Sequence, residues 1–398
     1  MDNWGKYLRA KEPGVREKAY AWKTAIGLQK VDGLTPSAYL IKTAQRNIEG
    51  KITLAETREL VAGYHKAMKI AAGKGADRAA EADIVAQHIT EVLSEESFTF
   101  SPEELVSIHK RLFEGIFEFA GRIRDYDITK EEWVLNGDTV RYGSAYRLME
   151  TLAFDFKQER KFSYVGISDD ELIGHIAHFT ANLWQIHAFG EGNTRTTGVF
   201  VIKYLRTLGF DVQNDVFAEN AWYFRNALVR ANYTNIPKGI EETSEYLEKF
   251  FRNLLLGEHN ELKSRYLLVG GWQDGDCDPA SNPASNPTSE KATQSSLKLQ
   301  LSSQVRRLLA VIDGEMTRAA LMKALGLKDR VTFTNSYLAP CLKIGLVEMT
   351  QPDSPRSPTQ RYRLTDKGRN SAGTSPPENA RWLGFRARKA NCGANCGC

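Results

Sequence analysis

The feature that most constrains this chain is a polar, glycine-containing stretch at 186–195, which lies between two apolar segments with helical periodicity. One apolar pattern runs from 172 to 184, and Gly190 and Gly192 then interrupt it. A second apolar run, at 199–205, reads as the body of a new helix. We therefore expect a helix, a tight loop and a second helix, with the polar side chains gathered at the junction.

The side chains at this junction suit chemistry on a phosphate. His187 stands at the helix exit as a candidate base, and Glu191 is a candidate metal ligand. Asn193 can shape the loop, and Arg195 can bind phosphate. The first N–H groups of the second helix point outward, and neighbouring glycines let an anion approach them. Taken singly, His187 could be a buried helix cap and Glu191 a solvated loop residue, but the ordered set favours a site.

Residues 187–195 resemble the signature of the Fic (filamentation-induced-by-cAMP) family, His-x-Phe-x-Asp/Glu-Gly-Asn-Gly/Lys-Arg-x-x-Arg. The resemblance implies transfer of AMP from ATP to a Ser, Thr or Tyr hydroxyl of a target protein, with Mg²⁺. It implies that His187 is the general base, that Glu191 holds the Mg²⁺ and that Phe189 anchors the loop in the core. It also implies that nucleotide phosphates meet the remaining positions of the loop: Gly190, Gly192, Asn193, Thr194 and Arg195.

Three positions depart from this signature. Ala188 replaces the usual proline, and Thr194 replaces the usual glycine or lysine. Gly198 stands where the family has a second arginine, which contacts the γ-phosphate. Two alternatives therefore stay open beside AMP transfer. One is a nucleotide-sensing transcriptional regulator with weak or no transferase activity, and the other is a Fic enzyme that uses another phosphate-containing donor.

A helical pattern at 36–70 is broken once, near Gly50. Glu49 and Gly50 resemble the end of the inhibitory motif of the Fic family, Ser/Thr-x-x-x-Glu-Gly/Asn, although Gln45 stands at its first position. The resemblance implies an inhibitory glutamate that pairs with an arginine of the signature, and Arg195 is the candidate partner here. The alternative for Glu49 is a helix-terminal glutamate followed by a C-cap glycine.

Several helix starts can be read from capping residues. Thr53 precedes Glu56 by three residues, and Ser101 precedes a helical pattern that extends to residue 117. Ser168 precedes the acidic first turn of the helix that leads to the signature. Residues 120–124, Ala-Gly-x-Ile-Arg, are similar to a further landmark of the Fic family.

The segment 127–142 carries an Asn136-Gly137 pair between two β-prone runs, which predicts a hairpin. Its location is similar to that of the flap of the Fic family. The resemblance implies that the exposed edge of this flap holds the target protein by strand addition. Trp133, Val134 and Leu135 are the expected target-binding residues.

We expect a mainly α-helical protein, with a Fic-type catalytic domain bearing a β-hairpin flap and a small winged-helix (α+β) domain after it. The chain has 398 residues, which is enough for several domains. The expected boundaries are a lead-in at 1–35, the catalytic domain at 36–256, a linker at 257–296, the winged-helix-like domain at 297–370 and a polar, basic tail at 371–398.

The C-terminal domain is expected from three short helical patterns followed by two strand candidates, an order that resembles a winged-helix domain. Its third helix carries Lys328, Arg330, Asn335 and Ser336, and is the element that could enter a DNA major groove. A regulatory protein is the alternative partner for this domain.

Charge and composition add weaker constraints. The net charge of +4 neither favours nor excludes nucleic acid binding. The first residues lack a secretory pattern and no stretch has the length and apolarity of a membrane span, so we expect a cytoplasmic protein without a membrane partner. Five cysteines, three of them in the tail at 392, 396 and 398, do not suggest a disulfide framework. The oligomeric state stays open.

Overall fold

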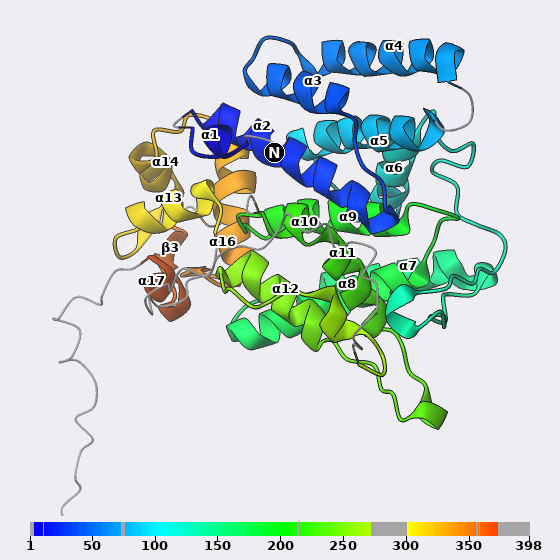
Figure 1. Ribbon diagram of the computed structural model, residues 1–398. Helices are drawn as coiled ribbons and strands as arrows, with labels where there is room; N and C mark the ends of the chain where they lie inside the picture. The colour runs from blue at the N-terminus through cyan, green and yellow to red at the C-terminus, as the bar shows by residue number, and fades with distance from the viewer. Residues whose placement is uncertain are drawn as a thin grey trace, which may run out of the picture.

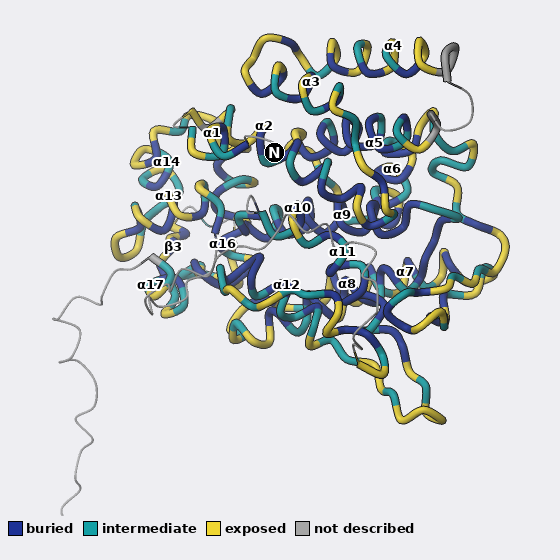
Figure 2. The backbone as a smooth tube through the Cα atoms, in the orientation of Figure 1, coloured by how far each residue is buried: buried dark blue, intermediate teal, exposed yellow. Residues whose placement is uncertain are grey.

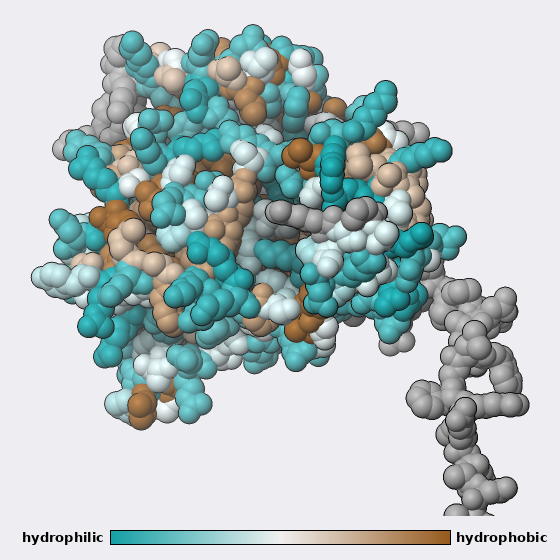
Figure 3. Space-filling model, turned by 180° about the vertical axis from the view of Figure 1, so that it is seen from behind, coloured by the Kyte–Doolittle hydropathy of each residue, from teal (hydrophilic) through white to brown (hydrophobic). Residues whose placement is uncertain are grey.

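The computed structural model describes residues 4–10, 12–72, 76–212, 215–271, 301–355, 357 and 359–372. The fold is mainly α-helical, as the sequence predicts, and a small antiparallel sheet lies in the C-terminal part (Figure 1). Among the described residues no helix is long and apolar enough to cross a membrane. Hydrophilic side chains cover much of the face seen in Figure 3, with smaller hydrophobic patches between them.

The larger part of the fold is a layered set of helices. Its α-helices are α1 (Gly5–Leu8), α2 (Pro13–Leu28), α3 (Ala38–Ile48), α4 (Leu54–Ala72), α5 (Ala76–Ser94), α6 (Pro102–Phe113), α7 (Leu148–Lys161), α8 (Asp169–Ile186), α9 (Asn193–Thr207), α10 (Val216–Glu219), α11 (Ala221–Arg230) and α12 (Glu245–Leu256). Short 3₁₀ turns join them at η1 (Gln29–Asp32), η3 (Trp133–Leu135), η4 (Ala145–Arg147), η5 (Ile236–Lys238) and η6 (Ser264–Leu267).

The predicted helix caps are present. The Ser101 hydroxyl accepts the N–H of Glu104 at 3.1 Å at the start of α6. Ser168 and Glu171 form a complete capping box at the start of α8. Thr53 and Glu56 exchange the same pair of hydrogen bonds at the start of α4. Each cap satisfies N–H groups that a helix start would otherwise leave without a partner.

Helix α9 lies inside the helical part and is buried along most of its length, as the dark blue tube in Figure 2 shows. Every residue from Asn193 to Leu205 is buried. Helix α8 packs beside it and ends at the loop 187–192. This loop is therefore held between two helices that pack against each other.

Described residues of segment 1–35, the expected lead-in, contribute to this core. Helix α2 packs against α5 and α10, and its Trp22 side chain is fully buried. A Cβ atom at Gly27 would lie 2.3 Å from the carbonyl oxygen of Ala218, so only glycine allows α2 and α10 to approach this closely. The expected linker also begins too early, because Leu267 in η6 is fully buried. Residues 272–300 lie outside the described residues.

The predicted β-hairpin at 127–142 is not formed. These residues contain no strand, and the 3₁₀ turn η3 takes the place of the first arm. Asn136 and Gly137 do form a turn with positive φ, and the Glu132 N–H bonds the Asp138 carbonyl at 2.9 Å. No ladder extends from this bond, because the consecutive residues Val134 and Leu135 are both buried rather than alternating between two faces.

The C-terminal part contains helices and a three-stranded antiparallel sheet in the order β1-β3-β2. Its elements are α13 (Ser303–Val311), β1 (Met316–Thr317), α14 (Arg318–Ala324), α15 (Arg330–Thr332), η7 (Phe333–Leu338), α16 (Ala339–Lys343), β2 (Val347–Met349), β3 (Arg361–Leu364) and α17 (Asp366–Ala372). The three predicted helical segments and two predicted strands are present, whereas β1 and α17 were not expected. The winged-helix assignment itself stays a prediction.

This C-terminal part packs on the end of α9. The Ser302 N–H donates to the Gly209 carbonyl at 2.7 Å, and Phe210 and Leu301 form an isolated β-bridge. A Cβ atom at Gly209 would lie 2.8 Å from Val305, so the contact is close. The predicted tail at 373–398, with its cysteines, lies outside the described residues.

Candidate functional site

His187 ends helix α8 in the left-handed conformation, with φ of 49°. Only two non-glycine residues among the described ones have positive φ, so this backbone is unusual. The His187 N–H still bonds the Trp184 carbonyl at 3.0 Å. The conformation turns the chain sharply out of the helix, which confirms the predicted position of His187 at a helix exit.

Arg124 fixes this turn from outside the signature. Its Nε donates to the His187 carbonyl at 2.7 Å, and its backbone N–H donates to the Ala188 carbonyl at 3.0 Å. The same guanidinium also donates to the carbonyls of Tyr126, at 2.6 Å, and Gly143. One side chain therefore ties the segment after α6 to the loop, which gives a physical role to the landmark at 120–124.

The His187 imidazole is an unused proton acceptor inside the fold. Its residue is 3% exposed, and neither ring nitrogen has a hydrogen-bond partner among the described residues. The Tyr142 ring covers it with centroids 4.2 Å apart, and Trp184 meets it edge-on. Burial holds the pKa of the imidazole well below its usual range, and the nearby Lys130 charge acts in the same direction. The ring is therefore neutral at physiological pH.

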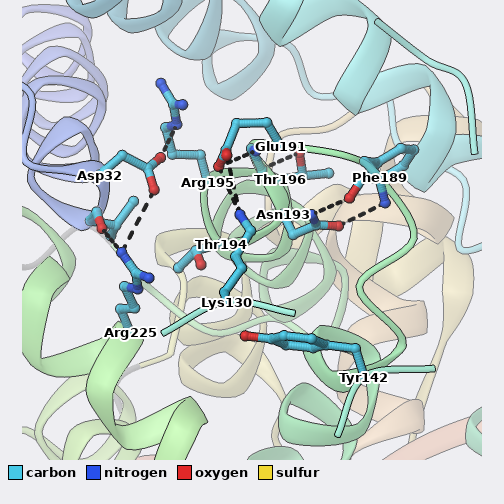
Figure 4. A network of polar contacts seen from close by, with 12 residues as sticks. Asp32, Lys130, Tyr142, Phe189, Glu191, Asn193, Thr194, Arg195, Thr196 and Arg225 are labelled. Carbon is cyan, nitrogen blue, oxygen red and sulfur yellow. Dashed lines mark hydrogen bonds and ion pairs between the residues drawn. The ribbon is translucent and has the colours of Figure 1, made fainter. Parts of the chain in front are cut away.

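Asn193 and His109 shape the loop around Phe189. The Asn193 amide accepts the Phe189 N–H at 2.9 Å and donates to the Phe189 carbonyl at 2.7 Å (Figure 4). The buried Phe189 ring stacks on the His109 ring at 3.7 Å, as its predicted anchoring role requires. His109 Nδ1 accepts the Gly121 N–H, so Nε2 is the nitrogen that donates to the Glu191 carbonyl, at 3.0 Å. Burial lowers the pKa of His109 to about 4, which keeps this arrangement neutral.

The two loop glycines lie at close contacts with aromatic side chains. Gly192 has φ of 77°, and a Cβ atom there would lie 2.3 Å from the Phe113 ring. A Cβ atom at Gly190 would lie 2.6 Å from the Tyr126 hydroxyl. Thr194 is buried, and its hydroxyl accepts the indole N–H of Trp184 at 3.0 Å. The Thr194 side chain thus joins α8 to α9, a role that glycine at this position could not perform.

Glu191 projects from the loop toward Lys130, as Figure 4 shows. The Lys130 ammonium lies 3.1 Å from each carboxylate oxygen, and the Gly192 N–H donates to one of them at 3.1 Å. Burial acts to raise the pKa of the Glu191 carboxyl, but the Lys130 charge, the hydrogen bonds from Lys130 and the Gly192 N–H, and the Arg195 charge together lower the pKa below its usual range. Glu191 is therefore an ionised carboxylate.

Arg195 is a fully buried guanidinium bound on several sides. Its Nε lies 2.7 Å from Asp32, and its Nη2 donates to Glu81 at 2.8 Å. Its Nη1 donates to Gln29 at 3.2 Å, and the Phe113 ring covers it at 4.7 Å. Figure 4 shows Asp32 between Arg195 and a second arginine, Arg225.

Position 198 on helix α9 lies against neighbouring helices. A Cβ atom at Gly198 would lie 3.3 Å from Leu28 and 3.7 Å from Phe217. Side chains of α2 and α10 therefore lie directly beside Gly198.

The predicted pairing of Glu49 with Arg195 is wrong. The Glu49 carboxylate instead contacts Lys51 at 2.7 Å, Lys6 at 3.4 Å and the Tyr7 hydroxyl at 2.5 Å. These contacts, with the Lys51 hydrogen bond largest, lower the pKa of Glu49 to about 2. Gly50 follows with φ of 73°, so the alternative of a helix-terminal glutamate before a C-cap glycine describes this position.

The predicted target-binding residues are mostly inaccessible. Val134 and Leu135 are buried in the core, which corrects their assignment to an exposed edge. The Val134 carbonyl accepts the Val269 N–H at 2.9 Å, so this backbone is already paired. Trp133 is partly buried and packs near Trp222, with ring centroids 6.1 Å apart.

Sequence reasoning missed Lys130, His109, Asp32 and Glu81. Each comes from a segment remote from the signature, and no local pattern marks it as a partner of the loop. A lysine in a loop and a histidine on a helical face are ordinary in sequence. Their contacts with Glu191, Phe189 and Arg195 exist only after the helices pack.

A magnesium ion fits this site by way of one carboxylate. No group of three or more His, Cys, Asp or Glu side chains among the described residues could hold a metal ion. Mg²⁺ in phosphate-transfer sites is often held by one or two carboxylates together with substrate phosphates. Glu191 is ionised and 43% exposed, so it fits this mode if Lys130 moves away.

Two segments of the chain match family models. Residues 99–205 match the model of the Fic/DOC family, and residues 303–365 match that of the "Filamentation induced by cAMP protein Fic-like, C-terminal domain". The first match contains the loop, helix α8 and helix α9 as far as Leu205, whereas Asp32 and Glu81 lie outside it.

Curated relatives align with less than a third of the chain. "Protein adenylyltransferase VbhT" of Bartonella schoenbuchensis is 28% identical over 116 residues, which are 29% of this chain and 23% of that protein. "Probable protein adenylyltransferase Fic" of Salmonella typhimurium and its Escherichia coli counterpart are each 25% identical over 118 residues, 30% of this chain and 56% of theirs. The chain thus matches about a quarter to about half the length of these relatives.

A solved structure of a Fic family protein from Desulfovibrio desulfuricans covers 92% of this chain and 90% of its own. The two share 20% sequence identity, and the TM-score is 0.41.

Proposed function

We propose that this chain, a protein with a Fic/DOC-family domain, is an adenylyltransferase that transfers AMP from ATP to a hydroxyl side chain of a target protein. The observation that carries the proposal is the His187 imidazole, which is neutral, buried and without a hydrogen-bond partner among the described residues. A neutral imidazole can take a proton at physiological pH. The adenylyltransferase names of the partial relatives support the same chemistry.

In this reaction the hydroxyl oxygen of the target attacks the α-phosphorus of ATP, and the hydroxyl proton passes to His187. The bond between the α-phosphorus and the bridging oxygen breaks, and pyrophosphate leaves. Arg124 holds the His187 backbone in place through its bond to the His187 carbonyl. Glu191 would hold a magnesium ion, which when bound offsets negative charge on the phosphates.

The phosphates would lie near the start of α9, where the helix dipole favours an anion. Asn193 keeps the loop in shape by binding both backbone groups of Phe189. Arg195 supports the loop from inside the core and does not meet the phosphates, because it is fully buried and bound by Asp32 and Glu81. The acceptor hydroxyl reaches His187 once the Tyr142 ring moves aside, since that ring covers the imidazole.

The test uses ATP labelled at the α- or the γ-phosphate, with magnesium and a cell lysate that supplies target proteins. We expect only the α-label to enter protein, and His187→Ala to reduce its incorporation by about 100-fold or more. His178→Ala is the matched control, because His178 is an exposed histidine on the same helix that contacts Asn182. Entry of the γ-label, or full incorporation by His187→Ala, would reject the proposal.

A second candidate function is DNA binding by the C-terminal part. Residues 301–372 contain twelve Lys and Arg against six Asp and Glu, a net charge of +6 in a chain whose total is +4. Lys323, Lys328 and Arg330 are exposed, and no ion pair involving them occurs among the described residues. They lie around the start of the third helical segment, the part that meets base edges in helix-turn-helix proteins.

This second function predicts DNA binding that weakens steeply with salt. In the double variant Lys328→Ala with Arg330→Ala, the slope of the logarithm of the binding constant against the logarithm of the salt concentration should become shallower, by about the contribution of two phosphate contacts. Arg363→Ala is the control, because Arg363 is already paired with Glu348 and Glu315. Equal DNA binding by the double variant and by the Arg363→Ala control would reject this assignment. A protein partner would then be sought for the surface around Lys328 and Arg330.

A further inference from the structure

Lys130 pairs with a carboxylate that water can reach. Its ammonium contacts both oxygens of Glu191 at 3.1 Å, and the two side chains are 25% and 43% exposed. Ion pairs that are partly hydrated contribute little net stability, so their partners exchange readily. The lysine stem is long and flexible, which allows the ammonium to move between neighbouring anions.

The other cations near the loop are committed to the fold. The Arg195 guanidinium is fully buried between Asp32 and Glu81. Arg225 donates to Glu132 at 2.9 Å and to the Val31 carbonyl at 2.8 Å. Arg124 donates to the backbone carbonyls of His187, Tyr126 and Gly143. Arg124 and Lys130 are the described cations whose side chains bind residues 187–192 directly, and of these two Lys130 is the one whose partner is a partly exposed carboxylate.

A nucleoside triphosphate brings several negative charges to the start of α9. Such a ligand would meet the Glu191 carboxylate there, an anion that repels it unless a cation lies between them. The Lys130 ammonium is already at that place. Position 198, one turn further along α9, supplies no cation because it is a glycine.

We infer that Lys130 is a phosphate-binding residue of this site, which leaves Glu191 and binds the phosphates of ATP when the nucleotide enters. In the free protein the same lysine neutralises Glu191. After the exchange the Glu191 carboxylate is released to bind a cation that accompanies the nucleotide. The inference rests on the proposed function for its ligand, and it assigns to segment 127–132 a nucleotide-binding role in place of the predicted target-binding edge.

The experiment measures binding of adenosine, AMP and ATP to the full chain by isothermal titration calorimetry, with magnesium present. For Lys130→Met we expect ATP to bind about 10- to 100-fold more weakly, the usual effect of losing a charged hydrogen bond. Adenosine, which has no phosphate, should bind equally to the variant and the wild type. Lys130→Arg keeps the charge and should retain most of the ATP affinity.

Lys238→Met is the matched control, because Lys238 also contacts segment 127–142, through Asp138 at 3.7 Å, but is 61% exposed. Its ATP affinity should equal that of the wild type. Unchanged ATP binding by Lys130→Met, or an equal loss for ATP and adenosine, would overturn the inference. If the wild type binds ATP without transferring AMP, the proposed function fails while the affinity difference still decides the role of Lys130. A wild type that does not bind ATP would reject both.

Discussion

Two charged clusters flank the loop 187–192 and differ in how far water reaches them. Arg195 is 0% exposed and lies among Asp32, Glu81 and Gln29, whereas Glu191 is 43% exposed and has Lys130 as its cation. A buried guanidinium has lost its hydration and depends on its anions, while a hydrated pair can exchange partners at little cost. The same loop therefore has one cluster that fixes its shape and one that can respond to a ligand.

Removing the anions of the buried cluster should give the largest effect. In the double variant Asp32→Asn with Glu81→Gln, the volumes are kept but a fully buried guanidinium loses both carboxylates. We expect the free energy of unfolding to fall by about 3–5 kcal/mol, measured by chemical denaturation. Glu49→Gln is the control and should cost far less, because Glu49 pairs with exposed lysines. A double variant as stable as the control would contradict the comparison.

The polar clamp inside the loop should give the next largest effect. Asn193→Ala leaves the buried N–H and carbonyl of Phe189 without their partners, and we expect a loss of about 2 kcal/mol in unfolding free energy. Asn182→Ala removes an amide that contacts only the exposed His178 among the described residues, and should change stability by less than about 0.5 kcal/mol. If the two substitutions cost the same, Asn193 does not hold the loop as its contacts suggest.

The partly exposed pair of Glu191 and Lys130 can be tested through the pH dependence of AMP transfer, because the Lys130 charge acts on His187. His187 must be neutral to accept a proton, and its pKa in the folded protein is lowered well below the usual value near 6.5 by burial and then by Lys130. The rate should therefore stay level as the pH falls from about 7.5 to about 5.5, where an ordinary histidine would lose about tenfold of its base form. In Lys130→Met the pKa rises, so the decline should begin at a higher pH. A wild-type rate that halves near pH 6.5 would show an ordinary imidazole.

The smallest effect is expected at Glu49. Its carboxylate binds Lys6, Lys51 and Tyr7 and not an arginine of the loop. The rate of AMP transfer by Glu49→Gly should therefore equal that of the wild type, measured with α-labelled ATP. A gain of tenfold or more would mean that Glu49 reaches the site in a conformation different from this one.

Much of the fold can be read from local patterns, because each depends on neighbours in sequence. Thr53, Ser101 and Ser168 cap the helices that they were expected to cap, since a cap needs only an N–H group two or three residues ahead. The hairpin at Asn136-Gly137 failed for the opposite reason. The turn formed, but the burial of Val134 and Leu135 in the core decided against a strand.

The candidate site divides in the same way. The order of His187, Phe189, Glu191, Gly192, Asn193 and Arg195 was enough to predict a helix exit, a loop and a helix start, because these are local consequences of residue type. The partner of Arg195 could not be predicted, since any acidic residue in the chain was a candidate. Packing of α2 and α5 on α9 chose Asp32 and Glu81 and left Glu49 elsewhere.

The sequence by itself determined that a histidine, a carboxylate and the start of a helix would meet at residues 187–195. Only the tertiary structure decided which charged side chains there are held in buried ion pairs and which can exchange one partner for another. That distinction depends on burial, because the strength of an ion pair depends on whether water reaches it, and exposure is a property of the packed fold. Lys130 and Arg195 are both cations in the sequence. The packing of the core makes Arg195 a fixed support and leaves Lys130 as a candidate phosphate ligand.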